Sequence, residues 1–359
     1  GKEKKMKKIF SLVLCVLMVF ALMAGCSPNV DSGDGQTSVQ TVEFPVTVTD
    51  QIGNEITVDE LPERIVSGYY ISSSACIALG LEDKLVAVEE GTDQRPIYQL
   101  AAPELLETAG NVGSAKSFDL EACIAAEPDL VILPKKAQDY AQTLKEMAIP
   151  AIVVSPESHE ELVQMIELIG TLTDTVDRAD TLVAKYEELL GKVENITADI
   201  SDEEKPYVYM CGTNSYMTTV PKDMYQSSLI AAAGGKNAAE NIDGDSWTDV
   251  SYEQFLSMNP DVIIIPSNNM ANGQPDYSAD DISADPQLSE IKAVKDEKIY
   301  NMPYGFEAWD SPVPSGVLGT LWITAVLYPD EYSMEDFAKD AADFYQEFYD
   351  FEMDTSAIV

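Results

Sequence analysis

Two stretches of the sequence, DLEACIAAEPDLVILP at residues 119–134 and SYEQFLSMNPDVIIIP at residues 251–266, follow the same pattern. Aligned without gaps, both carry Glu at the third position, Pro-Asp at the tenth and eleventh, and Pro at the sixteenth. Asp119 and Ser251 are good N-cap residues, and each helix must end before its proline, because the residue before proline is disfavoured in the helical region. The apolar runs LVIL and VIII then fit strands covered on both faces. The repeat therefore predicts a helix that leads into a buried strand, once in each half of the chain.

The neighbouring segments extend this pattern. Residues 42–58, VEFPVTVTDQIGNEITV, alternate around the turn signal Gly53-Asn54 and predict a hairpin. Residues 63–88 predict a strand, a Ser-rich turn, a helix and a second strand, with Ala75, Ala78 and Leu79 facing inward. Residues 140–155 and 186–212 each predict a helix followed by a strand. The fold class is therefore α/β, with two doubly wound lobes whose sheets are mainly parallel.

The segment between the two halves predicts one long helix. A chain of 359 residues exceeds the usual size of a single core, so two lobes are expected. Residues 174–200 contain one Gly and no Pro, and their apolar residues form a single helical stripe. We therefore expect an N-terminal lobe at 43–173, a stiff linking helix at 174–200 and a C-terminal lobe at 201–359. The stripe consists of Ala179, Leu182, Val183, Tyr186, Leu189, Leu190, Val193 and Ile196.

The N-terminus carries the marks of export. Residues 1–25 combine a lysine-rich start with an apolar run that is too short to span a membrane comfortably, as in a removed signal peptide. Cys26 closes the motif LMAGC, which resembles the lipobox where a bacterial lipoprotein is cleaved and lipidated. Residues 26–42 are rich in Ser, Gly and Asp and predict a flexible tether. The alternative is an ordinary signal peptide in which Cys26 has no role.

Composition excludes several classes of protein. The net charge of −40 would repel nucleic acid, whose binding requires basic groups against phosphates. Cys76, Cys123 and Cys211 are widely spaced, so we expect small buried hydrophobes and no disulfide framework.

Catalysis and direct metal binding also find no support. The sequence lacks the glycine-rich nucleotide motifs and the GxSxG nucleophile motif, so we expect no enzyme. His159 is the only histidine, which excludes capture of a bare zinc or manganese ion by a histidine cluster. Its position near a helix start predicts a solvated side chain, whereas Trp322 is expected in the core.

Five segments in order resemble one family over nearly all of the chain beyond the tether. They are ERIVSGYYISSSACIALG, GNVGSAKSFDLEACIAAEPDLVI, LIAAAGGKNAAENI, WTDVSYEQFLSMNPDVIII and LGTLWITAVLYPDEY. Together they look like the vitamin B12 and ferric-siderophore group of ABC-importer substrate-binding proteins. The resemblance implies two α/β lobes bridged by a long helix, with the ligand in the cleft between the lobes. It also implies a monomer that works with a permease dimer and separate ATPase subunits.

The resemblance gives the repeated glutamates a role. Glu121 and Glu253 match the positions at which family members dock, one Glu from each lobe, onto arginines of the two permease subunits. Two similar lobes against a two-fold dimer make a matched pair of contacts natural. The alternative is that each Glu only stabilises the first turn of its helix through the helix dipole.

Ligand contacts are expected in the loops at the carboxyl ends of the strands. Flat aromatic faces there suit a large chelate or corrin ring, and amide, hydroxyl and basic groups add polar contacts. Only three arginines occur, and Arg95 alone is placed to face the cleft. This scarcity favours hydroxamate-type iron chelates or a corrinoid over strongly anionic catecholates. The candidates are Trp247, Trp309, Phe306, Tyr304, Asn214, Lys116, Arg95 and Ser73.

Two acidic residues in the same region, Glu307 and Asp310, either meet cationic or hydroxyl-bearing cargo or face water. We therefore expect an extracytoplasmic lipoprotein, anchored to the cell membrane, that captures a ferric siderophore or similar iron chelate and uses no cofactor of its own. A cobalamin, corrinoid or haem binding protein of the same family is the alternative. An enzyme and a purely structural lipoprotein are the other classes of function considered.

Overall fold

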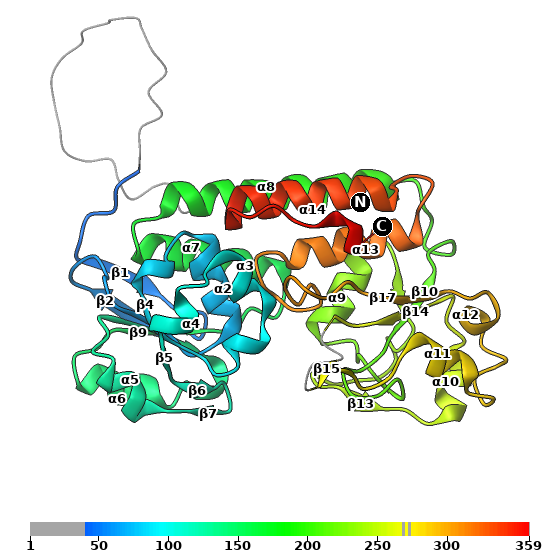
Figure 1. The fold of residues 1–359 in the computed structure, drawn as a ribbon, viewed down its shortest axis with the longest axis horizontal. Helices are drawn as coiled ribbons and strands as arrows, with labels where there is room; N and C mark the ends of the chain where they lie inside the picture. The colour runs from blue at the N-terminus through cyan, green and yellow to red at the C-terminus, as the bar shows by residue number, and fades with distance from the viewer. Residues whose placement is uncertain (1–39, 268–269, 272–273, 359) are drawn as a thin grey trace, which may run out of the picture. The chain divides into compact units, whose positions relative to one another are not determined.

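The structure is a computed structural model that describes residues 40–267, 270–271 and 274–358 (Figure 1). The predicted signal peptide, the predicted lipidation site Cys26 and all but the last residues of the predicted tether lie outside the described residues.

The predicted hairpin is present at the start of the described chain. Strands β1 (Val46–Thr49) and β2 (Glu55–Val58) pair antiparallel. Asp50 stabilises the turn, because its Oδ1 accepts the backbone N–H groups of Ile52 at 3.1 Å and Asn54 at 2.8 Å. Its other carboxylate oxygen accepts the N–H of Val153 at 3.0 Å and so joins the hairpin to the main sheet.

The first lobe is built on a five-stranded parallel sheet in the order β5-β4-β3-β8-β9. Side chains alternate between the two faces, so the sheet is buried on both sides. One face packs against α2 (Tyr70–Ala78) and α7 (His159–Leu172), and the other against α5 (Leu120–Ala125) and α6 (Tyr140–Glu146). The strands are β3 Ile65–Ser67, β4 Leu85–Val88, β5 Gly110–Asn111, β8 Leu130–Pro134 and β9 Ala151–Val154.

The second lobe repeats this plan with a four-stranded parallel sheet in the order β12-β10-β14-β17. One face packs against α9 (Tyr225–Ala232), and the other against α10 (Tyr252–Met258) and α11 (Ala279–Ala284). The doubly wound parallel architecture predicted for each half is therefore confirmed. The strands are β10 Tyr207–Met210, β12 Lys236–Asn237, β14 Val262–Ile265 and β17 Ile299–Asn301.

The duplicated sequence forms the same unit in both lobes, α5 followed by β8 and α10 followed by β14. Asp119 accepts the backbone N–H of Ala122, and Ser251 forms a capping box with Gln254. Before each proline, the chain passes through a left-handed residue, Glu127 at φ 49° and Asn259 at φ 41°. Every residue of the two strands is buried. The prediction of a helix that leads into a buried strand is confirmed.

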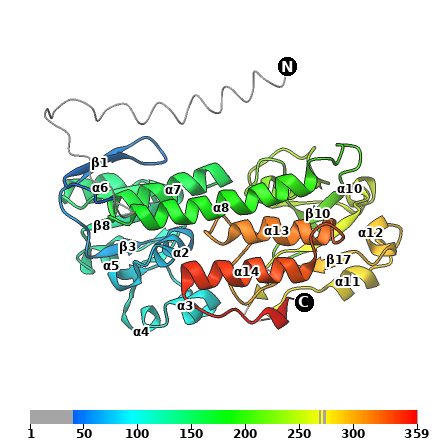
Figure 2. The same ribbon diagram turned by 90° about the horizontal axis from the view of Figure 1, so that it is seen from above.

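Three long helices lie side by side above both sheets (Figures 1 and 2). They are α8 (Val176–Thr197), α13 (Gly316–Leu327) and α14 (Met334–Tyr349). Helix α8 is the predicted linking helix, and Ala179, Leu182, Tyr186, Leu189 and Val193 of its predicted stripe are buried. One continuous hydrophobic core contains residues of both sheets and of these helices, Trp322 among them as predicted.

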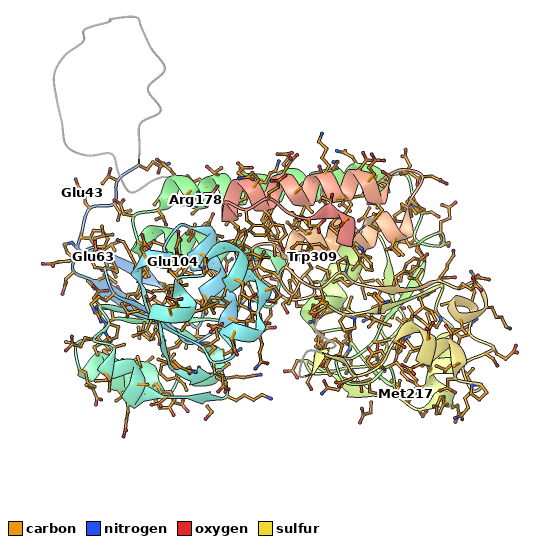
Figure 3. All side chains as sticks on the ribbon, viewed as in Figure 1. Glu43, Glu63, Glu104, Arg178, Met217 and Trp309 are labelled. Carbon is orange, nitrogen blue, oxygen red and sulfur yellow. The ribbon has the colours of Figure 1, made fainter. Side chains whose placement is uncertain are left out.

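A polar contact in the first turn of α8 joins elements that are distant in sequence. Arg178, labelled in Figure 3, donates from Nε to the carbonyl of Ala78 at 2.6 Å and from a terminal nitrogen to the carbonyl of Phe348 at 2.8 Å. These carbonyls belong to the last turns of α2 and α14, where unpaired carbonyls attract a cation. Arg178 therefore ties the linking helix to both.

The Ser-rich stretch differs from the prediction of a turn. Ser72, Ser73 and Ser74 lie within α2 and are buried. Serine is tolerated there because each hydroxyl has a hydrogen-bond partner. Ser72 bonds to the carbonyl of Tyr69 and to Ser67. Ser73 bonds to Ser67 and Glu89, and Ser74 bonds to Glu307.

The remaining elements are short. None of the helices in the described ranges combines the length and apolar character needed to cross a bilayer. The short elements are α3 Pro96–Ala101, α4 Leu105–Thr108, α12 Lys292–Lys295, β6 Gly113–Ser114, β7 Ser117–Phe118, β11 Thr218–Thr219, β13 Thr248–Asp249, β15 Met270–Ala271 and β16 Gln274–Pro275.

Candidate functional site

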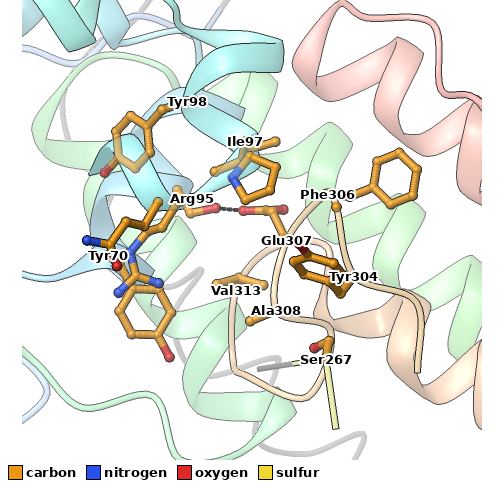
Figure 4. A pocket seen from close by; sticks show the side chains of 14 residues that line it. Tyr70, Arg95, Ile97, Tyr98, Ser267, Tyr304, Phe306, Glu307, Ala308 and Val313 are labelled. Carbon is orange, nitrogen blue, oxygen red and sulfur yellow. Dashed lines mark hydrogen bonds between the residues drawn. The ribbon is translucent and has the colours of Figure 1, made fainter. Parts of the chain in front are cut away.

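A cavity of about 110 Å³ lies between the two lobes. The first lobe contributes residues of α2 and of the segment around α3, and the second contributes residues that follow β14 and β17 (Figure 4). These segments follow the carboxyl ends of parallel strands, where α/β proteins bind ligands. The side chains that matter below are Tyr70, Ser74, Arg95, Tyr304, Phe306 and Glu307.

Arg95 is the one arginine among the described residues that line this cavity, and its role as a ligand contact stays a prediction. Its guanidinium carbon lies 4.1 Å from the centre of the Tyr70 ring, in a cation–π arrangement. Its Nε lies 3.8 Å from Oε1 of Glu89, an ion-pair distance that is too long for a hydrogen bond. The buried Nε has no hydrogen-bond acceptor among the described residues.

Glu89 is a buried carboxylate behind Arg95. It accepts hydrogen bonds from the hydroxyls of Ser73 at 2.6 Å and Tyr98 at 2.7 Å. Burial raises the pKa of Glu89, while the two hydroxyls and Arg95 act in the opposite direction.

Glu307 faces the cavity from the second lobe. It accepts hydrogen bonds from Ser74 of the first lobe and from Ser315 of the second, so the two lobes meet at this carboxylate (Figure 4). Its side chain is buried, and burial raises its pKa against the opposing effect of these hydroxyls and of Tyr349.

Tyr70 extends this polar contact between the lobes, and Asp310 lies next to its partner Ser311 in the second lobe. Asp310 is buried and accepts a hydrogen bond from Ser267. Tyr70 donates to Ser311 at 3.0 Å across the lobes. Neither Glu307 nor Asp310 faces water, which corrects that alternative for both.

The predicted aromatic residues of the 304–309 loop separate into two groups. Tyr304 is 52 % exposed and lines the cavity together with Phe306, of which only 7 % is exposed. Trp309 is fully buried, and its indole N–H donates to Tyr345 at 2.7 Å (Figure 3). Trp309 therefore departs from the expectation of a ligand contact, because it packs beneath Phe306 in the core, with ring centres 5.9 Å apart.

The other predicted ligand residues do not line this cavity. Ser73 is fully buried and bonded to Glu89. Lys116 is exposed between β6 and β7, and Asn214 is exposed in the segment after β10. Trp247 is half-buried just before β13 and packs against the main core. The structure thus brings together Arg95, Tyr304 and Phe306 from the predicted set.

Sequence reasoning missed several residues of the site. Ser74 and Tyr98 line the cavity, and Glu89 lies next to Arg95. The available signal for Glu89 was position, because it directly follows strand β4.

His159 also differs from the prediction of a solvated residue. Its Nδ1 lies 2.7 Å from the hydroxyl of Tyr186, and its ring meets the edges of the rings of Tyr186 and Tyr225. Its Nε2 lies 3.4 Å from Oγ1 of Thr320. Burial lowers the pKa of His159 to about 4. The imidazole is therefore a neutral packing group where α7 meets α8, α9 and α13.

The three cysteines are buried, as predicted. Cys76, Cys123 and Cys211 are free and buried. Within the described ranges, no group of three or more His, Cys, Asp or Glu side chains is placed to hold a metal ion.

Glu121 and Glu253 are both exposed in the first turns of α5 and α10. Both helices lie on the side of the molecule that is opposite α8, α13 and α14 (Figure 1). The two glutamates therefore belong to equivalent positions at one face, one in each lobe.

The family whose members are described as periplasmic binding proteins matches residues 65–304, which contain both parallel sheets and the part of the cavity wall up to Tyr304. The chain belongs to the periplasmic binding protein family. Members of this family are the solute-binding proteins of ABC transporters, a role without catalysis. This periplasmic binding protein is accordingly the substrate-binding protein of an ABC importer.

Individual relatives cover most of the chain. An uncharacterised ABC transporter substrate-binding lipoprotein of Bacillus subtilis, YvrC, is 26% identical over 91% of this chain and 99% of its own. The molybdate-binding protein MolA of Haemophilus influenzae is 26% identical over 84% of this chain and 90% of its own. The structure of MolA with molybdate superposes with a TM-score of 0.73, covering 86% of this chain and 99% of MolA at 24% identity. A cobalamin-binding protein of Halobacterium salinarum is 27% identical over 62% of this chain and 58% of its own.

Proposed function

We propose that this periplasmic binding protein captures a metal-centred organic complex, a ferric siderophore or similar iron chelate, and delivers it to its permease. A corrinoid such as cobalamin, or haem, is the alternative of the same kind. The observation that carries the proposal is the composition of the cavity wall, which contains the aromatic rings of Tyr70, Tyr304 and Phe306 and a single arginine, Arg95, stacked on Tyr70. Aromatic faces of this kind suit a bulky, partly apolar ligand.

The size of the cavity limits how such a ligand binds. Sites for drug-sized ligands enclose roughly 300 to 1,000 Å³, and this cavity holds about 110 Å³. One arm or edge of a chelate enters it, and the remainder lies over the rim. Tyr304 is 52 % exposed and provides apolar surface there. The cobalamin-binding relative supports the corrinoid alternative.

A small oxyanion is the second candidate. The cavity volume fits an ion such as molybdate, Arg95 provides a cation, and MolA is a molybdate-binding relative. This candidate requires Arg95 to be available to the anion.

Delivery completes the proposal. Cys26 would carry the lipid that holds the protein at the extracytoplasmic face of the membrane. Glu121 and Glu253 would contact the two permease subunits, and their equivalent exposed positions on α5 and α10 support this. Separate subunits would hydrolyse ATP, and the protein would act as a monomer.

A panel of probes tests the cargo. The full chain is titrated by calorimetry with a ferric trihydroxamate, hydroxocobalamin, haemin and molybdate, with thermal unfolding measured in parallel. A saturating specific ligand raises the stability, by about 2.7 kcal/mol at a concentration one hundred times Kd. Binding of molybdate and of none of the chelates would contradict the principal proposal.

A matched pair of variants locates the site. Tyr304→Ala removes the exposed ring at the cavity and is expected to weaken chelate binding. Tyr207→Ala removes a ring that is 38 % exposed at the amino end of β10, the opposite end of that strand from the cleft, and is expected to leave binding intact. Equal effects of the two substitutions would place the site elsewhere.

A further inference from the structure

The charges around the cavity are arranged so that its one arginine is already neutralised. Oε1 of Glu89 lies 3.8 Å from Nε of Arg95, and Glu89 is 4 % exposed. In its ionised form, which Arg95 and the hydroxyls of Ser73 and Tyr98 favour against the effect of burial, a carboxylate at this distance acts through a medium that screens weakly and offsets much of the attraction that Arg95 exerts on an anion. The cation therefore does not give the cavity a net positive charge.

A second carboxyl group enters the same cavity from the opposite lobe. Glu307 is one of the lining residues, and its hydrogen bonds to Ser74 and Ser315 fix it in place. Whether it is protonated or ionised, Glu307 adds no positive charge. An anion that reached Arg95 would therefore lie in a cavity that Glu307 also lines, next to a guanidinium already paired with Glu89.

Beyond the site, a net charge of −40 repels anions at long range.

The carboxylate of Glu89 is not required by packing alone. Ser73 donates to its Oε2 and Tyr98 to its Oε1, so a glutamine of the same shape keeps one of these bonds with its amide oxygen, and its NH2 group donates to the other hydroxyl. What the carboxylate adds to a glutamine of the same shape is negative charge next to Arg95.

We infer that the cavity selects cargo whose inserted face is uncharged or cationic, and that Glu89 is the residue that sets this preference by neutralising Arg95. This inference rests on the proposed function and narrows it. It favours a hydroxamate chelate or a corrinoid over a catecholate chelate or an oxyanion. Arg95 then acts as a hydrogen-bond donor and a flat surface stacked on Tyr70.

Glu89→Gln tests the inference because it removes the charge and keeps the shape. The full-length wild type and the variant are titrated by calorimetry with four probes of different charge. The probes are a cationic ferric trihydroxamate, hydroxocobalamin, a trianionic ferric triscatecholate and molybdate. We expect Glu89→Gln to raise the affinity for the triscatecholate or molybdate on the order of tenfold and to lower that for the cationic chelate. Glu90→Gln is the control, since it removes an exposed carboxylate from the adjacent position and is expected to change each affinity less than twofold.

The outcomes separate this inference from the proposed function. Wild-type protein that binds an anionic probe more tightly than every uncharged or cationic probe would overturn the inference, and this result does not depend on the folding of a variant. An unchanged ranking in folded Glu89→Gln would also overturn it, even where chelate binding supports the proposed function. Wild-type protein that binds none of the four probes would instead contradict the proposed function itself.

Discussion

The single histidine makes one prediction unusually direct. His159 is half-buried at the junction of four helices, with its Nδ1 2.7 Å from the hydroxyl of Tyr186 and a pKa lowered to about 4 by desolvation. In the unfolded chain its pKa returns to the ordinary value of about 6.5. The native state therefore favours the neutral imidazole. Stability from this site is fully present above pH 6.5 and is lost as the pH falls towards 4.

The size of the effect follows from the two pKa values. A pKa of about 4 against about 6.5 corresponds to about 3 kcal/mol between the limits, and to about 2 kcal/mol between pH 7 and pH 4.5. Burial also raises the pKa values of Glu89, Glu307 and Asp310, so these groups favour the folded state as the pH falls. The total stability therefore combines opposite trends, and only a comparison with a variant isolates the histidine.

The comparison uses His159→Asn, whose side-chain oxygen can replace Nδ1 as the partner of Tyr186 and does not titrate. Urea unfolding of both proteins at pH 7, 5.5 and 4.5 gives the difference in free energy of unfolding. We expect the wild type to lose about 2 kcal/mol relative to the variant across this range. The NMR signal of the only imidazole, recorded on protein without a histidine tag, should stay at its neutral position down to about pH 5. A constant difference between the two proteins, or an imidazole that titrates near 6.5, would refute the argument.

Three further predictions concern docking, cargo and core. Combined Glu121→Ala and Glu253→Ala substitutions should abolish uptake in cells while calorimetric affinity for the cargo is unchanged; a loss of affinity would refute the docking role. Trp247→Ala should weaken cargo binding by about 1 to 3 kcal/mol if the half-buried ring contacts the ligand, and an unchanged isotherm would assign the ring to the core. Trp309→Ala should lower the free energy of unfolding by about 3 to 5 kcal/mol, because a fully buried indole with a hydrogen-bonded N–H is removed. Urea unfolding measures this difference, and a loss below about 1 kcal/mol would contradict the assignment of Trp309 to the core.

The sequence predicts the fold well because the signals for it are local. N-caps at Asp119 and Ser251, prolines that end the helices, and apolar runs of strand length all act within a few residues of the elements they define. The linking helix is equally visible, since its buried stripe follows the helical period from Ala179 to Val193.

The site is less predictable because its geometry depends on contacts between distant segments. The partner of Ser74 is Glu307, and the partner of Tyr70 is Ser311. No local pattern distinguishes a buried acid with such partners from an acid that faces water. Trp309 shows the converse, since an aromatic residue in a cleft loop is equally suited to a ligand or to the core.

The contacts between the lobes have a consequence for motion and docking. Opening the cleft would separate Ser74 from Glu307 and Tyr70 from Ser311. This separation costs free energy, because the buried carboxyl group of Glu307 would lose a hydrogen-bond partner. Arg178 adds a third tie between α2, α8 and α14. Displacement on ligand binding is therefore expected mainly in rim residues such as Tyr304. Helices α5 and α10 are each attached to a buried strand, so we expect the spacing between Glu121 and Glu253 to stay the same when cargo binds. A permease that binds both glutamates would then recognise the protein with or without cargo. Only rim residues such as Tyr304 would differ between the two states.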